Sequence, residues 1–397
     1  MDNLHLVQFA PPQFPSGPSA ATAARPEEFI PAPSDAVRTF AFMANLYAQE
    51  ASGDPAASAS PERVVHRLRG SNESTTHIFA LVEGTQPLGE VSPLCVPLIP
   101  STGECPDYDY AGFIHISVPL LEEKDTADLD FVLDVNFLPL PGQPLDDDAQ
   151  QVATTLVSHG MELAQKMGRS TLQASSLHAD GTSADADPFS AAYREAGFNI
   201  KHAERQLKVQ VPEYPATVLI PAGFSAHAWL DYDIPEDYLD DVIRLLTIAS
   251  EDSLTGDLSV EPIQWNRARL AEAHGRLRSR NAHTLMVALV DDSTQTVVAL
   301  TELGRHAGSD PEVAEWTITV TAREWRQQQL ATKIKLFSLT KLREHWPDVQ
   351  RTYASIGVDD TAMNHIFDGL GATGISQSEA WELKPQERLS SQDVQSH

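Results

Sequence analysis

The chain has 397 residues, a formal net charge of −28 and a pI of about 4.7. This charge argues against a nucleic-acid-binding protein, because contacts to phosphates require clustered Lys and Arg, and it argues equally against docking on an anionic membrane. No apolar run approaches the length of a membrane span, and the N-terminus lacks the basic and apolar regions of a signal peptide. The two cysteines form neither a disulfide framework nor a metal motif, so we expect a cytoplasmic protein.

The first half of the chain carries helix and strand patterns in an order typical of an α/β protein with a mixed sheet. After a Pro-rich arm that contains one strand, we expect two helices, four strands, and then helix, strand, helix and strand. The expected ranges are, in chain order, Leu4–Phe9, Asp35–Ala51, Pro61–Arg69, His77–Val82, Leu88–Val96, Ala111–Pro119, Leu129–Leu138, Gln150–Met167, Ser170–Ser175, Phe189–Ala196 and Ala203–Val211.

The second half repeats this order, which indicates an internal duplication of about 180 residues. The segments Y-R-E-A-G-F at 193–198 and F-D-G-L-G-A at 367–372 occupy equivalent places in the two halves. The expected ranges are Pro235–Ile248, Asn266–Arg278, His283–Leu289, Val297–Leu303, Val313–Thr321, Gln327–His345, Val349–Ile356, Asp360–Leu370 and Ser378–Leu383.

A Pro-rich segment, Pro212–Ala222, is the expected linker between the two halves. It predicts an N-terminal domain over residues 1–211 and a C-terminal domain over residues 223–385. The polar residues 386–397 are expected to form a disordered tail.

One strand–turn–helix segment, Trp316–Lys335, has the features of a phosphate-binding site. Residues 317–320 are β-branched, which favours a packed strand, and Leu330, Ile334 and Phe337 place one apolar stripe on the following helix. Such a turn can direct unpaired backbone N–H groups and the positive end of the helix dipole at a phosphate. An ordinary strand–turn–helix unit, which is common in α/β folds, would carry the same pattern.

Within this segment, Arg326-x-x-Gln329-x-Ala331 resembles the pyrophosphate-binding pattern of the GNAT acyltransferases, roughly Gln/Arg-x-x-Gly-x-Gly/Ala. It is more similar to a subgroup, the actinobacterial tandem-GNAT proteins related to mycothiol synthase, whose segment runs T-x-V-x-x-x-H-R-G-H-R-L-G-x-x-L-K. Gln327 replaces a Gly of that pattern, and it leaves room for phosphates only if its backbone stays helical and its side chain points outward.

The resemblance implies two tandem GNAT domains and an N-acetyltransferase that uses acetyl-CoA as co-substrate. The acceptor would be the amine of a small molecule, and the protein would be a monomer or homodimer. The resemblance assigns acetyl-CoA binding to Thr319, Val320, Arg326, Gln327, Gln329, Leu330, Ala331 and Thr332.

The equivalent segment of the first half, Pro139–Ala149, contains no Arg and places Asp146, Asp147 and Asp148 at the start of a helix. Carboxylates there pair well with the helix N-terminus but repel a pyrophosphate. We therefore expect acyl-CoA to bind only in the second half.

Acyl transfer from a thioester to an amine requires a base for the amine and an acid for the leaving thiolate. Glu302 and Glu315 lie in predicted buried strands, where a carboxylate can have a raised pKa and act as the base. The alternative is that each faces solvent or pairs with an Arg. The backbone N–H near Val320 is the expected oxyanion donor.

Three features depart from the family pattern. The first is the Gln residues of the phosphate-binding turn, Gln327 and Gln329, which together with a missing Tyr favour a second hypothesis. Phe367 stands where relatives carry the Tyr that protonates the thiolate, and Tyr353 is the alternative donor. Asp359 and Asp360 replace Asn residues near the cofactor wall. A catalytically inactive GNAT-fold protein that binds or scaffolds is therefore the alternative. No other catalytic motif, and no metal-ligand spacing among the histidines, is present.

Overall fold

The computed structural model describes residues 3–13, 31–85, 87, 89–139, 143–213, 215, 218–306 and 308–384, so the predicted tail at 386–397 lies outside the described residues. The chain forms two compact units, each built on a mixed sheet. Unit 1 comprises Met1–Ala203, Thr255–Val260 and Ser376–His397, and unit 2 comprises Glu204–Leu254 and Glu261–Ile375. None of the described helices is both long and apolar enough to cross a membrane.

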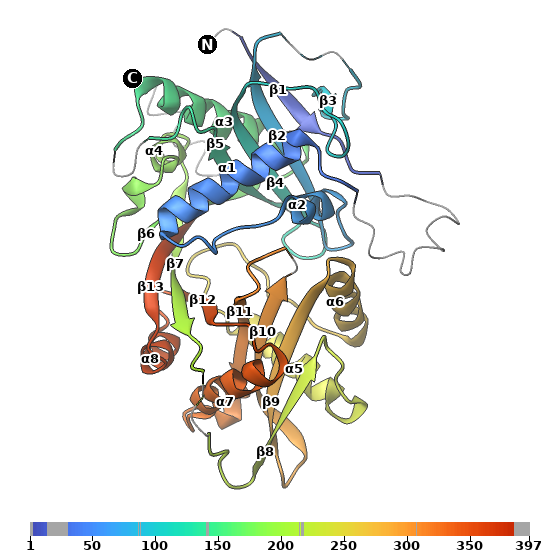
Figure 1. Cartoon of the computed structure of the whole chain (residues 1–397), viewed down its shortest axis with the longest axis vertical. Coiled ribbons are helices and arrows are strands. Elements are labelled where there is room, and N and C mark those ends of the chain that lie inside the picture. The colour runs from blue at the N-terminus through green and yellow to red at the C-terminus, as the bar shows by residue number, and fades with distance from the viewer. Residues whose placement is uncertain are drawn as a thin grey trace, which may run out of the picture. The chain divides into compact units, whose positions relative to one another are not determined.

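Unit 1 has one sheet with helices on both faces. Its strands are β1 (Leu4–Phe9), β2 (Ser74–Glu83), β3 (Leu98–Ile99), β4 (Tyr110–Pro119), β5 (Thr126–Leu133), β6 (Thr171–Ala179) and β13 (Thr373–Leu383), in the order β3-β1-β2-β4-β5-β6-β13. Its helices are α1 (Asp35–Ser52), α2 (Pro61–Leu68), α3 (Asp147–Lys166), the 3-10 turn η3 (Ala184–Ala186) and α4 (Ser190–Glu195). Helices α1 and α2 pack on one face, and α3 and α4 pack on the other (Figure 1).

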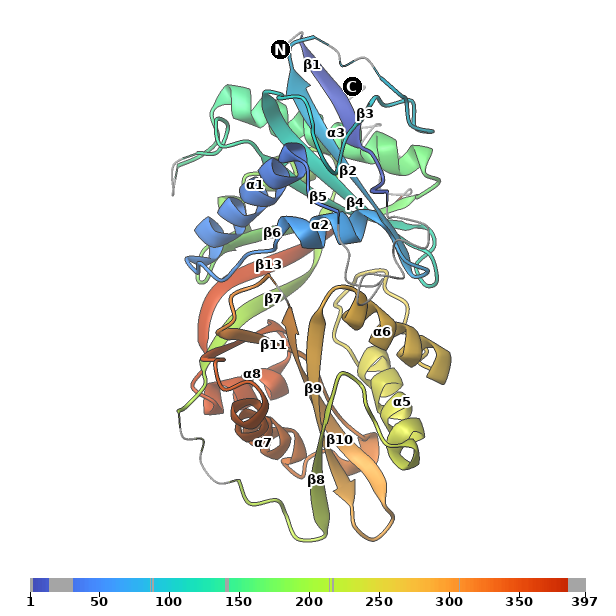
Figure 2. The same cartoon turned by 45° about the vertical axis from the view of Figure 1, so that its right-hand side comes forward.

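Unit 2 repeats this layered arrangement. Its strands are β7 (Asn199–Gln210), β8 (Phe224–Leu230), β9 (Ala282–Asp291), β10 (Thr296–His306), β11 (Val313–Thr321) and β12 (Arg351–Gly357), in the order β7-β12-β11-β10-β9-β8. Its helices are α5 (Glu236–Glu251), α6 (Arg267–Ser279), the 3-10 turn η4 (Arg323–Trp325), α7 (Leu330–His345) and α8 (Thr361–Gly369). Helices α5 and α6 cover one face of the sheet, and α7 and α8 cover the other (Figure 2).

Each unit receives its last strand from the other half of the chain. Strand β13, at the C-terminal end, pairs antiparallel with β6 of unit 1, and its Trp381 is only 1% exposed and donates to Ser176 Oγ at 2.9 Å. Strand β7, from the N-terminal half, pairs antiparallel with β12 of unit 2, where Leu207 is buried in the core. The predicted boundary between 211 and 223 therefore differs from the observed division, because a strand's sequence does not identify the sheet it joins.

A second contact explains why Thr255–Val260 belongs to unit 1. The backbone N–H of Ser259 donates to Glu382 Oε2 on β13 at 2.7 Å, and its hydroxyl donates to Oε1 at 3.1 Å. Gln173 on β6 donates to the Ser259 carbonyl at 3.3 Å. This loop of the second half is thus held by two neighbouring strands of unit 1.

Most predicted elements are present, with two errors of note. Where we expected a strand over Leu88–Val96, the described residues form turns, with only an isolated bridge between Val91 and Pro97. Strand β8 was not predicted; its segment F-S-A-H-A-W-L is mostly half-buried, so its apolar pattern is weak. Helix α1 begins as predicted, and Ser34 caps it, because Ser34 Oγ accepts from the Val37 N–H at 3.3 Å.

Candidate functional site

The edge of β11 that faces β12 is open along most of its length. The two parallel strands pair only from Val313 to Glu315, with Glu315 opposite Tyr353. On its other edge, β11 pairs with β10, and the register shifts so that Thr317 is an extra residue between the pairs Leu303–Trp316 and Glu302–Ile318. Such a bulge bends a strand and increases its twist, which accounts for the parting of β11 from β12.

Backbone alternation identifies which groups of β11 face the gap. The N–H of Ala322 donates to the Val298 carbonyl on β10 at 2.8 Å. Because successive backbone groups of a strand alternate in direction, the N–H of Val320 is directed at β10 as well. The expected oxyanion donor near Val320 is therefore not the N–H of Val320 itself, and the neighbouring N–H groups of Thr319 and Thr321 are the ones directed at the gap.

Beyond the end of β11, the segment Arg326–Thr332 has an unusual backbone. Gln327 has φ of 64° and Gln329 has φ of 61°, both left-handed, and they flank Gln328, whose φ is negative. Non-Gly residues rarely adopt this conformation, so the two positions keep the geometry for which the family pattern uses Gly. Our expectation of a helical backbone at Gln327 was wrong, but its side chain is exposed, as the fit of a phosphate requires.

The N–H groups of this segment are available to a ligand. From Gln327 to Thr332, none of them donates to another group in the described part of the chain, and Gln329, the N-cap of α7, makes no side-chain cap. Successive N–H groups with alternating backbone hand form a concave anion-binding nest. The N-terminus of α7 adds its partial positive charge.

The Arg326 side chain is already engaged within the protein. Its Nε donates to the Thr321 carbonyl at 3.2 Å, and its Nη2 forms an ion pair with Asp252, the residue after α5. The neighbouring Arg323 also pairs with Asp252, at 2.6 Å, and the two Arg side chains hold the pKa of Asp252 at about 2. Arg326 thus fastens the nest to α5, and contact with a phosphate would require it to turn away from Asp252.

Glu302 on β10 is a buried carboxyl beside the bulge. It is 3% exposed, and its Oε1 accepts from the Thr317 hydroxyl at 2.5 Å. Its Oε2 has no hydrogen-bond partner among the described residues, although the phenol of Tyr232 lies nearby. Burial raises the pKa of Glu302, and the Thr317 and Tyr232 hydroxyls offset only part of this effect. The position and the raised pKa suit a general base.

Glu315 is placed differently from our prediction. It lies on the same face of the sheet as Glu302, because it pairs with Gly304, two residues further along β10. However, it is exposed rather than buried. Among the other predicted residues, Thr319 contacts Thr301 through their hydroxyls at 2.7 Å, and Leu330 is buried in the core under α7.

A buried lysine in this region received no functional role in the sequence analysis. Lys335 on α7 is 1% exposed, and its Nζ lies 4.6 Å from the centroid of the Trp316 ring and 4.4 Å from that of Phe367. Burial lowers the pKa of Lys335 to about 7. The available signal was its position beside Ile334 on the apolar stripe of the helix, where a charged residue is unexpected.

The residues around α8 agree in part with our expectations. Phe367 is fully buried, and its ring packs edge-on against that of Trp316, with 5.4 Å between the two ring centroids. Tyr353 is half-buried on β12. Asp360 is the N-cap of α8, where its Oδ1 accepts from the Met363 N–H at 2.9 Å, so this departure from the family pattern has a structural cause.

The equivalent region of unit 1 has neither the bulge nor the uncapped helix start, although β5 likewise pairs with β6 only from Thr126 to Leu129. Strands β4 and β5 pair from Gly112–Leu133 to Ser117–Asp128 without a register shift. At the start of α3, Asp146 Oδ1 accepts from the Ala149 N–H at 2.8 Å, and Asp147 follows in the first turn. A carboxylate therefore already occupies the helix N-terminus.

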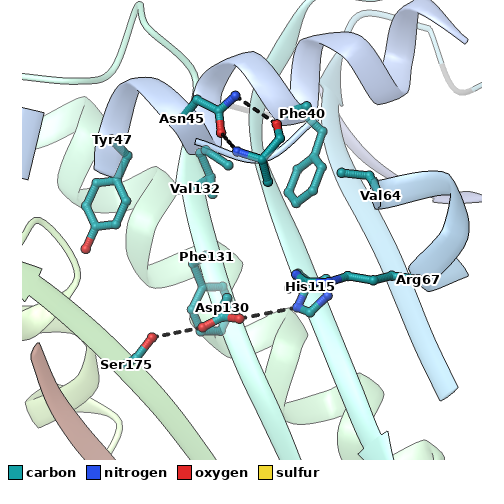
Figure 3. Close-up of a pocket in the computed structure, with 13 residues that line it drawn as sticks. Phe40, Asn45, Tyr47, Val64, Arg67, His115, Asp130, Phe131, Val132 and Ser175 are labelled. Atoms are coloured by element: carbon teal, nitrogen blue, oxygen red, sulfur yellow. Dashed lines mark hydrogen bonds and ion pairs between the residues drawn. The ribbon is translucent and has the colours of Figure 1, made fainter. Parts of the chain in front are cut away.

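Unit 1 nevertheless contains a cavity of about 210 Å³ against α1, α2 and strands β4 to β6 (Figure 3). Asp130 on its wall accepts from the Ser175 hydroxyl at 2.9 Å and lies 3.3 Å from His115 Nδ1. Burial acts to raise the pKa of Asp130, but His115, Ser175 and Arg67 lower it below its ordinary value. The ring of Phe40 stacks on His115. The cavity is thus lined by both polar and apolar side chains, as small-molecule sites are.

Solved structures with the same arrangement of elements exist. A tandem GNAT protein from the clavulanic acid biosynthesis pathway, solved without acetyl-CoA, matches with a TM-score of 0.66 and 19% identity over 96% of this chain and 98% of that chain. A GCN5-related N-acetyltransferase from Sphaerobacter thermophilus matches with a TM-score of 0.57 and 13% identity over 96% and 95% of the two chains. No family model and no curated protein matches the sequence. The mixed α/β chain has the tandem GNAT fold.

Proposed function

Because the chain has the tandem GNAT fold, we propose that it is an N-acetyltransferase that moves the acetyl group of acetyl-CoA to the amine of a small molecule, with the chemistry in unit 2. One observation carries the proposal: the segment Arg326–Thr332 presents unpaired N–H groups at the start of α7, next to the open edge of β11. Unit 1 lacks this feature because Asp146 caps α3.

Different backbone groups of unit 2 bind different parts of acetyl-CoA. The N–H groups of Gln327 to Thr332 hold the pyrophosphate, and this interaction needs no charged side chain. The open N–H of Thr321 and the carbonyl of Thr319 pair with the amides of the pantetheine arm, as a strand edge pairs with an added strand, whereas the Thr321 carbonyl already accepts from Arg326. The thioester then lies beside the bulge at Thr317, where the N–H of Thr319, the nearer of the two, stabilises the developing oxyanion.

Glu302 acts as the general base in this proposal. Its carboxylate accepts a proton from the acceptor ammonium, and the resulting amine attacks the thioester carbonyl. Because burial raises the pKa of Glu302, the rate should increase with pH through a midpoint above the ordinary range of a carboxyl group. Above that midpoint Glu302 is ionised and competent.

The matched pair Glu302→Gln and Glu315→Gln tests this assignment. Both changes remove a carboxylate from the same face of the sheet, but only Glu302 is buried beside the bulge. Glu302→Gln should lower kcat by at least about 100-fold, the usual contribution of a general base, while acetyl-CoA affinity stays the same. Glu315→Gln should change kcat little. Equal losses in the two variants would contradict the assignment.

The acceptor is proposed to be cationic, because the chain carries a net charge of −28. A panel of diamines and neutral amines of similar size, compared by kcat/KM at low and high salt, tests this idea. Cationic amines should be preferred, and the preference should weaken as salt screens the charges. Equal turnover of both classes would count against a cationic acceptor.

Calorimetric titration of acetyl-CoA tests the binding site itself. Gln329→Asp places a carboxylate in the nest, as Asp146 does in unit 1, and Asp tolerates a left-handed backbone. This variant should weaken binding by more than about tenfold, or about 1.4 kcal/mol. The control Gln329→Asn has the same shape without the charge and should bind as the wild type does. A wild-type protein that does not bind acetyl-CoA, or a Gln329→Asp variant that binds normally, would overturn the proposal.

A further inference from the structure

The ammonium group of Lys335 is buried without a polar partner. Its Nζ lies against the rings of Trp316 and Phe367, and within the described part of the chain it makes no hydrogen bond and no ion pair. Burial of an unpaired charge is costly, and a cation–π contact returns only about 0.5–2 kcal/mol. A methionine would fill the same space without this cost, so stability does not explain the lysine.

The groups that face Lys335 cannot hold its charge. Trp316 of β11 and Phe367 of α8 do not titrate, and on α7 itself Ile334 and Ser338 are its neighbours on the buried face. Burial alone lowers the pKa of Lys335, to about 7. The group therefore exchanges a proton near neutral pH, as a catalytic acid must.

Lys335 is also in the right place for such a role. Trp316 directly follows Glu315, the last residue of β11 that pairs with β12, so Nζ lies near the point where the two strands part. Phe367, the other ring that Nζ contacts, has no hydroxyl to donate. A proton donor is thus present beside a residue that cannot serve as one.

We propose that Lys335 is the general acid that protonates the leaving thiolate of CoA, a role that rests on the proposed acetyl transfer. The amine attacks the thioester carbonyl and forms the new C–N bond. The C–S bond then breaks, and its electron pair leaves on sulfur. The Lys335 ammonium donates one proton to that sulfur and becomes a neutral amine, while Glu302 holds the proton taken from the acceptor. The attacking nitrogen keeps a second proton until the C–S bond breaks, and the new amide then loses that proton to solvent. Transfer of the Glu302 proton to solvent, and uptake of one proton by Lys335, restores the enzyme, so one proton is released for each ammonium consumed.

The test compares the wild type with Lys335→Met over pH 5.5 to 9.5. CoA thiol release is followed with a thiol reagent, using acetyl-CoA alone and with 1,4-diaminobutane as the probe amine. The kcat/KM of the wild type with the probe amine is divided by that of Lys335→Met, and this ratio is plotted against pH. Ionisation of the probe amine affects both enzymes equally and cancels in the ratio. The ratio should be at least about 100 below pH 7 and fall toward 1 above it, as Lys335 loses its proton.

Two further variants separate catalysis from packing. Lys335→Arg keeps a positive charge that does not titrate in this range and so cannot donate a proton. Its activity should be low, and it should not show the change near pH 7 that is expected of the wild type. Phe367→Tyr in the Lys335→Met background supplies a hydroxyl at the neighbouring ring and should recover part of the lost rate. Acetyl-CoA affinity, measured by calorimetry, should be the same in all variants.

The outcomes distinguish the two proposals. If the wild type binds acetyl-CoA and releases thiol, but Lys335→Met has the same rate at every pH or a loss that does not vary with pH, the acid role is wrong and the proposed function stands. If the wild type neither binds acetyl-CoA nor releases thiol, the proposed function is wrong, and the acid role is overturned with it.

Discussion

The two units have the same order of strand, connecting segment and helix, but the helix N-terminus is capped in unit 1 and uncapped in unit 2. In unit 1, Asp146 caps α3 and the preceding strand pairs without a bulge. In unit 2, Gln329 leaves the first N–H groups of α7 unpaired, and the bulge at Thr317 turns β11 away from β12. The fold thus provides a possible anion site in both halves, and a few groups at the helix start determine whether it is available.

The two helices also differ in the residues they bury. The buried face of α3 has no ionisable side chain and includes Val152, Ala153 and Leu156, whereas that of α7 includes Lys335 beside Ile334. A unit selected for stability alone would bury apolar groups at every such position. The costly group lies in the unit that also has the bulge and the uncapped helix start, which supports a division of labour between the units.

The largest expected effect tests the exchange of strands. Trp381→Ala removes a fully buried side chain from β13 and should destabilise unit 1 by about 3–5 kcal/mol, although the residue lies near the C-terminus. Hydrogen exchange, read segment by segment, should show lost protection in α3 and α4 of unit 1 and little change in α7. The reciprocal variant Leu207→Ala, in β7, should lower hydrogen-exchange protection in unit 2 and leave that of unit 1 unchanged. Loss of protection in α7 after Trp381→Ala would contradict the division into units.

The next effect concerns the buried lysine. The pKa of Lys335 is about 7 in the folded protein, compared with about 10.4 for a solvated lysine, so the unfolded chain binds the proton more tightly. The destabilisation that the buried Lys335 charge causes is therefore complete below about pH 7. It becomes smaller by about 1.4 kcal/mol per pH unit as the pH rises from there. Lys335→Met should stabilise unit 2 by a few kcal/mol at pH 6 and by little at about pH 10. Urea unfolding at both values, with the half-buried Lys333→Met as the control, measures the difference, and an equal gain at both values would contradict it.

The sequence was sufficient to predict the repeated element order, because long apolar stripes and β-branched runs report helices and strands directly. It was insufficient for the strand exchange, since the pattern of β7 and β13 shows that each has a buried face but not which sheet it joins. The left-handed Gln327 and Gln329 were also unpredictable, because Gln has no preference for that conformation. Lys335 was given no role from the sequence, and its burial was not predicted, because a helical lysine is usually solvated.

A smaller effect tests the cap in unit 1. Asp146→Ala leaves the Ala149 N–H without its acceptor and should destabilise α3 by about 1 kcal/mol. Asp146→Asn keeps an acceptor oxygen and should lose much less. Both variants should bind acetyl-CoA as the wild type does, since the proposed site lies in unit 2. Thermal unfolding and calorimetry measure the two properties, and weaker acetyl-CoA binding in either variant would mean that unit 1 takes part.

The smallest effect concerns the backbone of the nest. Gln327 holds a left-handed conformation that costs a non-Gly residue about 1 kcal/mol or more, and glycine adopts it freely. Gln327→Gly should therefore raise the free energy of unfolding by several tenths of a kcal/mol to about 1 kcal/mol, because greater freedom in the unfolded chain offsets part of the gain. Gln328→Gly, at a residue with negative φ, should instead lose stability. Acetyl-CoA affinity should be kept in Gln327→Gly, because the N–H groups stay in place. If that affinity fell sharply, the Gln327 side chain itself would be a ligand, and the nest would not act through its backbone alone.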